Sequence, residues 1–199
     1  MRRIVAFIRD TSGAIAAEFA LVLTILVLFL FGIMDVGYYA WELNRGEKAT
    51  QMGARWAVAT DLIPSGLAGY SFATDGGIPQ GTVVPQSAFP GVTCTSTGCT
   101  CSGTCNFGTT ANTASFNAIV ARIQDFKSDV APENVEVEYS WSGLGYAGDP
   151  NGPDVAPIIT VRLVNMEHRP LYGFIFGSVG LPEFAYSLTS EDGEGTFSH

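Results

Sequence analysis

The residues best placed to do chemistry in this sequence are Glu18 and the small residues Gly13 and Ala14. Glu18 is the only charged residue in a run of 21 residues that begins at Ala14 and ends at Met34. At ~1.5 Å rise per residue, a helix over this run is about 31 Å long, which matches the hydrocarbon thickness of a bilayer. A helix satisfies its own backbone hydrogen bonds in lipid, so the run predicts one transmembrane helix.

A carboxylate inside a membrane helix is costly, by ~2.5–3.5 kcal/mol near the centre and less near an end. If the chain is cut after Gly13, Ala14 becomes the new N-terminus and Glu18 is the fifth residue. The α-amine of Ala14 then adds its charge to a helix end that is already positive, because the leading N–H groups are unpaired. Glu18 of the same or a neighbouring subunit would neutralise this end. Such a pair is worth much more in lipid than in water, where it contributes about 1 kcal/mol or less. The alternative is that the Glu18 side chain simply extends toward the cytoplasmic headgroups.

The flanks of the apolar run predict its orientation. Residues 1–13 carry three arginines and one aspartate, and such a flank stays in the cytoplasm. We therefore expect a cytoplasmic leader at 1–13, a transmembrane helix at 14–36 and an exported, periplasmic domain at 37–199. Asp35 is expected to be an interfacial residue. Aromatic residues that fit the belt at the exported membrane surface follow it, namely Tyr38, Tyr39 and Trp41.

The composition excludes several classes of function. Without residues 1–13 the chain has seven basic and eighteen acidic residues, a formal net charge of −11. This charge argues against binding nucleic acid and against docking on anionic lipid. The sequence has no Gly-rich phosphate loop and no nucleophile motif, so we expect no enzyme activity, no cofactor and no small-molecule substrate. Glu167 and His168 are expected to form a solvated surface pair.

Four cysteines lie within twelve residues, at Cys94, Cys99, Cys101 and Cys105. Their spacing lacks the C-x-x-C pairs or histidine partners of zinc sites. In an exported domain, two local disulfides are the better interpretation. Three pairings are possible, and the sequence does not choose among them. The cysteines are expected to cross-link a loop rich in Gly, Ser and Thr.

A turn late in the chain offers oxygen ligands for calcium. Asp149, Asn151 and Asp154 lie within the segment DPNGPD. The spacing misses the EF-hand loop and lacks its distal glutamate, so a plain hairpin turn is favoured over a calcium site.

The remaining pattern predicts an α+β fold. The first helix, about 45 residues long, is expected to continue past the membrane until Pro64, with one packed face that consists of Ala49, Met52, Trp56 and Ala59. The small residues Gly46, Gly53 and Ala54 would allow another helix to approach closely.

A second helix is expected to be capped by Thr113 or Ser115 and to be closed by Pro132. Its apolar face contains Phe116, Ile119, Val120, Ile123 and Phe126. Strands are expected at 134–141, 158–164 and 183–190 as a small antiparallel sheet. Residues 64–112 would be a disulfide-stapled loop, and 171–181 a buried or partner-facing loop.

The N-terminal pattern resembles a known family. A basic leader, a glycine, a small residue, a glutamate at the fifth place after the glycine and an unbroken apolar helix are the signature of type IV prepilins. The form between Ser12 and Leu23, SGAIAAEFALVL, resembles the TadE-like proteins of the tight-adherence (Tad) pilus. The runs GIMDVG at 32–37 and MGARWA at 52–57 agree with that family. Thr24 departs from it, because a proline often stands near this place.

The resemblance implies a minor pilin-like subunit, or pseudopilin, of a Tad-type pilus in the bacterial inner membrane. Prepilin peptidase would cut between Gly13 and Ala14, and Glu18 would serve processing or assembly. The implied partners are the peptidase, other pilins and pseudopilins, the inner-membrane assembly platform and the lipid bilayer. The alternative is an uncleaved bitopic protein whose periplasmic domain binds or stabilises that platform.

Overall fold

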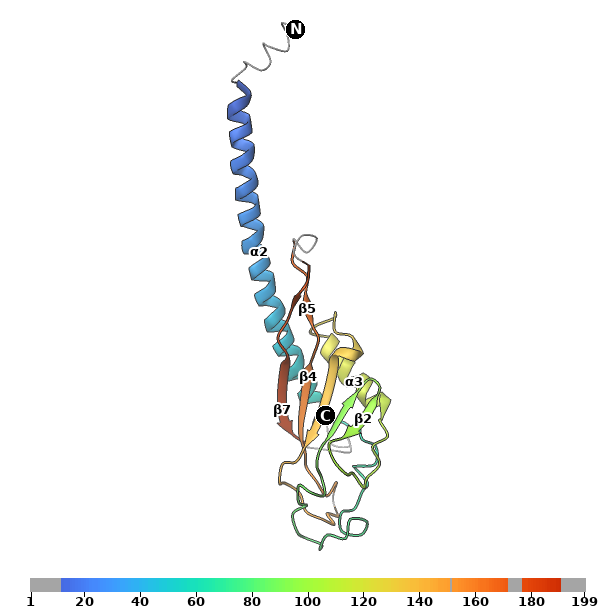
Figure 1. Cartoon of the computed structure of the whole chain (residues 1–199). Coiled ribbons are helices and arrows are strands. Elements are labelled where there is room, and N and C mark those ends of the chain that lie inside the picture. The colour runs from blue at the N-terminus through green and yellow to red at the C-terminus, as the bar shows by residue number, and fades with distance from the viewer. Residues whose placement is uncertain (1–11, 151, 172–176, 191–199) are drawn as a thin grey trace. The chain divides into compact units, whose positions relative to one another are not determined.

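The structure is a computed structural model that describes residues 12–150, 152–171 and 177–190 (Figure 1). Its helices and strands occur along the chain in this order: α2 (Ser12–Ala57), β1 (Val92–Thr95), β2 (Gly98–Cys101), α3 (Thr113–Gln124), the 3-10 turn η1 (Pro132–Asn134), β3 (Val135–Ser140), β4 (Ile158–Leu163), β5 (Glu167–His168), β6 (Val179–Gly180) and β7 (Phe184–Thr189).

The chain divides into two compact units. The first, which we call the helical unit, contains Met1–Glu42 and Arg169–Val179. The second, which we call the sheet unit, contains Leu43–His168 and Gly180–His199. Helix α2 contributes its first part to the helical unit and its last fifteen residues to the sheet unit.

The sheet unit is built on a five-stranded antiparallel sheet with the order β2-β1-β3-β4-β7. Side chains alternate along the central strands, so that one face is apolar and buried. On that face Val137 lies opposite Val161, and Tyr139 lies opposite Ile159. The other face is polar: Arg162 donates to Glu138 over 2.7 Å, and the hydroxyls of Thr160 and Ser187 are 2.8 Å apart.

The last turns of α2 present a stripe of small residues to the core of the sheet unit. The buried positions are Gly46, Ala49, Thr50, Gly53, Ala54 and Ala57, which recur with helical periodicity. A Cβ at Gly53 would be 2.7 Å from Ile123 of α3, and one at Gly46 would be 2.5 Å from the ring of Phe184 in β7. The expected close approach of a helix is therefore seen at Gly53. The expected face was partly wrong, because Trp56 is exposed and Met52 is only partly buried.

Helix α3 buries the predicted apolar face, except that Phe126 lies beyond the helix end and is partly exposed. Its cap is Asn112, whose Oδ1 accepts from the N–H groups of Ala114 and Ser115, so the expected caps Thr113 and Ser115 were wrong. The helix stops at Gln124, before Pro132, which instead begins η1.

The region 64–112 differs most from its expected description as a loop. It contains the hairpin β1–β2, and β1 pairs with β3 to extend the sheet. It also supplies buried core residues, among them Leu67, Phe72, Phe89 and Phe107. Its start pairs with its end, since Ser65 N–H donates to Thr110 and Asn112 N–H donates to Ile63. Helix α2 itself ends at Ala57, earlier than the proline at position 64 suggested.

The strands differ from the prediction in two smaller ways. Strand β3 ends at Ser140, and Trp141 turns outward so that its indole N–H donates to the Val84 carbonyl over 2.8 Å. The short strands β5 and β6, which form a two-stranded sheet, were not expected. The predicted fold class is confirmed: one long helix, a second helix, an antiparallel sheet and a disulfide-linked loop region form an α+β protein.

We predict that Gly53→Ala destabilises the sheet unit, because the added methyl group overlaps Ile123 and overpacking typically costs ~1–3 kcal/mol. Gly37→Ala is the matched control, since no heavy atom lies within 4 Å of a Cβ at that helical position. Thermal unfolding of the full chain in detergent, followed by near-UV circular dichroism, measures both. Equal melting temperatures for the two variants would contradict the close approach at Gly53.

Candidate functional site

The candidate site is the N-terminal end of α2, where the predicted cleavage and assembly residues lie. Ala14 and Glu18 are four residues apart on this helix, so they share a face about 6 Å apart along the axis. Both are exposed, and a Cβ at Gly13 would meet nothing within 4 Å. The Gly13–Ala14 bond lies at the start of α2 as the structure describes it, from Ser12 onward. The three leader arginines lie outside the described residues.

The surface of α2 beyond this site is apolar on all sides. Large apolar side chains are exposed from Ile15 to Val36, including seven consecutive ones at 25–31. The most apolar window of α2 has none of its residues buried. Among the described residues, α2 is the one helix that is both long enough and apolar enough to cross a membrane. A continuous exposed apolar surface of this kind calls for lipid or a protein partner.

Thr24, where the sequence departs from the family pattern, does not interrupt the helix. Its hydroxyl donates to the Ala20 carbonyl over 2.7 Å, one turn back. This bond satisfies the polar group within the same helix, so Thr24 fits an apolar environment without a second partner.

The end of the apolar run is marked by an acid and two aromatic rings. Asp35 Oδ1 accepts a hydrogen bond from the backbone N–H of Leu171 over 2.9 Å. One turn and two turns further on, Tyr38 and Trp41 stack with their ring centroids 5.5 Å apart. Both rings are about half exposed, as expected for residues at a membrane border.

The four cysteines form two disulfides, Cys94–Cys99 and Cys101–Cys105, which resolves the pairing that the sequence left open. Cys94 and Cys99 are cross-strand partners in the β1–β2 hairpin, and Cys94 is completely buried. The second disulfide closes the segment that follows β2, where Cys105 Sγ lies 3.9 Å from the Gly91 carbonyl oxygen. The first disulfide therefore cross-links the two strands of the hairpin, and the second links the end of β2 to the chain that follows it.

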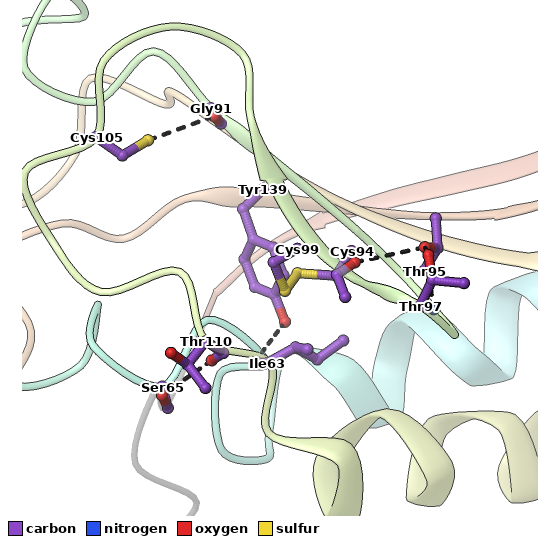
Figure 2. The surroundings of a disulfide bond; sticks show 11 residues. Ile63, Ser65, Gly91, Cys94, Thr95, Thr97, Cys99, Cys105, Thr110 and Tyr139 are labelled. Carbon is purple, nitrogen blue, oxygen red and sulfur yellow. Dashed lines mark hydrogen bonds between the residues drawn. A yellow bond between two sulfur atoms is a disulfide. The ribbon is translucent and has the colours of Figure 1, made fainter.

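Tyr139 lies next to the first disulfide and joins two distant parts of the chain (Figure 2). Its side chain is completely buried, and its hydroxyl oxygen accepts from the Ile63 N–H over 3.0 Å. Burial raises the pKa of the Tyr139 hydroxyl well above its ordinary value, and the hydrogen bond from Ile63 acts in the opposite direction. The sequence placed Tyr139 on the buried face of a strand but did not reveal this bond.

The candidate calcium residues do not act as one cluster in the described part of the chain. Asp154 is buried, and its two carboxylate oxygens accept backbone N–H groups from Phe72 over 2.6 Å and from Asp149 over 3.0 Å. These bonds tie two loops together, which agrees with the turn interpretation. The charge of Asp149 raises the pKa of the nearby Tyr146. Asn151 lies outside the described residues.

The expected solvated pair of Glu167 and His168 was wrong. Glu167 is exposed, but His168 is buried, because alternate residues of the short strand β5 point to opposite sides. In the described ranges, no group of three or more His, Cys, Asp and Glu side chains is arranged to hold a metal ion.

Fold and site together define an α+β protein with one N-terminal helix suited to crossing a membrane and a disulfide-linked sheet unit. Residues 13–55 match the family model described as TadE-like protein, which confirms the resemblance over this segment and relates it to the Tad pilus. The match begins at the glycine of the predicted cleavage site and covers nearly all of α2. No curated protein and no solved structure matches the chain.

We predict that alkali destabilises the protein partly through Tyr139. Its pKa is raised in the folded state, so its contribution to stability is fully present below the ordinary tyrosine pKa of about 10 and is lost as the pH rises above it. Tyr139→Phe should lower stability at neutral pH by ~1–3 kcal/mol, since the Ile63 N–H loses its acceptor. It should also flatten the fall in stability above pH ~10. Urea unfolding between neutral and alkaline pH measures both effects, and an unchanged slope in the variant would contradict this role.

Proposed function

We propose that this chain is a minor pilin-like subunit, or pseudopilin, of a Tad-type pilus. In this proposal prepilin peptidase removes residues 1–13, and the mature chain acts in pilus assembly or initiation through α2. The sheet unit would contact other pilins, pseudopilins or the assembly platform. The protein is then a substrate of the peptidase and a structural subunit, and it is not itself an enzyme.

The observation that carries the proposal is the position of Glu18. It is an exposed acid on an exposed apolar helix, one turn from the residue that would become the N-terminus. In lipid an isolated carboxylate is costly, and the α-amine of Ala14 is a cation at the right end of the helix to offset it. If the amine belongs to a neighbouring subunit, this pair sets the stagger between adjacent helices.

The family match supports the same assignment from a different direction. It covers residues 13–55, which include the proposed cleavage bond, Glu18 and the apolar helix. The exposed apolar surface of α2 supports it too, because helices that leave the bilayer for a filament need such a surface to contact each other.

We place the protein in the bacterial inner membrane with one span, its N-terminus in the cytoplasm and its sheet unit in the periplasm. The leader arginines support this orientation by the positive-inside rule. The two disulfides support export, since such bonds form in oxidising compartments.

We predict that Gly13→Leu leaves the leader attached, because a bulky side chain fills a position that is otherwise open next to the cleaved bond. Intact mass and N-terminal sequencing, with and without the peptidase, measure the outcome. The parent chain should begin at Ala14 only when the peptidase is present. A parent chain that keeps Met1 in cells would instead favour the uncleaved bitopic protein.

We predict that Glu18→Gln still inserts and is still cut but no longer supports piliation, because it removes the charge and keeps the size of the side chain. Glu18→Asp is the control that keeps the charge, and it should retain more piliation than Glu18→Gln. Electron microscopy of sheared pili and immunoblots of the processed subunit provide the two readouts. Normal pili in the Gln variant would refute the charge-pairing role.

A further inference from the structure

Strand β7 lies at one edge of the five-stranded sheet, where it pairs with β4 on one side only (Figure 1). Ser190 N–H donates to the Pro157 carbonyl over 2.8 Å, one step beyond the last pair of the β4–β7 ladder. On the β3 side of β4, Val164 N–H donates to the Asn134 carbonyl over 2.9 Å, which gives the same alternation. In an antiparallel ladder, hydrogen-bonded pairs alternate with pairs that are not hydrogen-bonded. Counting back from Ser190, every second residue of β7 therefore points its N–H and C=O toward β4.

The intervening residues of β7 point their backbone groups away from β4. They are Ala185, Ser187 and Thr189, and all three are exposed. Within the described residues, no hydrogen bond reaches the backbone groups of these three residues. The edge thus offers N–H and C=O groups at every second residue, a spacing that an extended chain matches.

This edge lacks the features that usually protect an edge strand. Such strands commonly carry charges, prolines or bulges, which prevent pairing with another chain. Pro182 and Glu183 precede β7, but the six residues of the strand are uncharged and pair with β4 without a bulge. An open and uncharged edge of this kind is a template for strand addition, which is a recurring mode of peptide recognition.

A groove of about 480 Å³ lies between the start of β7 and the last turns of α2, all within the sheet unit. Two exposed acids line it, Glu47 and Glu183, and in the described ranges neither forms a salt bridge. The base among its lining residues is Lys48, whose Nζ donates to Gln51 Oε1 over 3.3 Å. The groove therefore has an excess of negative charge, which a basic side chain would complement.

The two faces of β7 determine which side chains suit an added strand. On the core face the added side chains would lie beside Tyr186 and Leu188, which are only partly buried, so apolar residues fit there. On the other face they would lie beside Ser187 and Thr189, where small polar residues fit. Antiparallel pairing is the more stable arrangement. It brings the C-terminal end of the added strand to the start of β7, next to the groove.

We propose that β7 is a docking edge for an extended segment of another protein, which adds to the sheet as an antiparallel strand. The segment alternates apolar and small polar residues and ends in basic side chains that lie next to Glu47 and Glu183. A second copy of this chain is a poorer occupant, because the chain already has a net charge of −9. The proposal uses contacts within the sheet unit alone and does not rest on the proposed pilus role.

The test measures the binding of short fluorescein-labelled peptides to the full chain in detergent by fluorescence anisotropy. The first peptide alternates threonine and valine and ends in two arginines and an amide. The second ends in two glutamates instead. The third keeps the arginines but is N-methylated at its threonines, whose amides would face β7 because residues opposite Ser187 share its face. We expect the first peptide to bind about tenfold more tightly than either of the others. No binding of the first peptide at about 1 mM would overturn the proposal.

A pair of variants at the centre of the edge tests the backbone pairing. Ser187→Pro and Ser187→Ala both lose the hydroxyl contact with Thr160, but only the proline removes the outward N–H. The proline should weaken binding of the first peptide about tenfold, and the alanine by less than about twofold. Equal binding by the two variants would overturn the proposal. If the proline variant does not fold, the N-methylated peptide makes the same test on the unchanged protein, and its unweakened binding would overturn the proposal.

A second pair of variants tests the groove. Glu47→Gln combined with Glu183→Gln should weaken binding of the first peptide about threefold. Glu133→Gln combined with Glu167→Gln is the matched control, since it changes the net charge equally at exposed acids that do not line the groove. Equal weakening by both pairs would show a general attraction and overturn the assigned occupant. So would a chain that sediments as a dimer by itself and becomes monomeric on Ser187→Pro, because the occupant is then a second copy.

Discussion

Helix α2 has to suit two environments along one continuous rod. Its first half exposes large apolar side chains on every side, and its last turns bury a stripe of glycine, alanine and threonine against a sheet and a second helix. The rest of the sheet unit is arranged around this stripe: Phe184 of β7 fills the space at Gly46, and Ile123 of α3 fills the space at Gly53.

Disulfides and single polar side chains stabilise the part of the sheet unit that has little regular structure. The segment between α2 and α3 is rich in Gly, Pro, Ser and Thr, so its backbone loses much entropy on folding. Cys94–Cys99 and Cys101–Cys105 limit that loss, while Tyr139 and Asp154 each bind backbone N–H groups from this segment. These contacts join the long connection to the sheet, in addition to its buried apolar side chains.

Two carboxylates lie at opposite ends of the same apolar run, and the proposed pilus role depends on the first of them. Glu18 would meet a chain terminus, and Asp35 holds the backbone of Leu171. Both are acids that an apolar environment makes costly unless a donor or a cation is supplied. The helix therefore carries one polar attachment point at each border of the span, with a self-satisfied Thr24 between them.

Much of this protein followed from the local pattern of its sequence. The apolar run, the small residues of α2, the apolar face of α3 and the alternation in β3 depend on neighbours within one element, so periodicity was enough to predict them. Contacts between distant segments decided the rest. Such contacts are the pairing of β1 with β3 and the bond between Leu171 and Asp35. The burial of His168 also depends on the segments packed around it. The two disulfides join residues close in the sequence, but their pairing depends on the β1–β2 hairpin, which the sequence did not predict. Only the tertiary structure brings such residues together, because the free energy of each contact depends on what the rest of the fold places beside it.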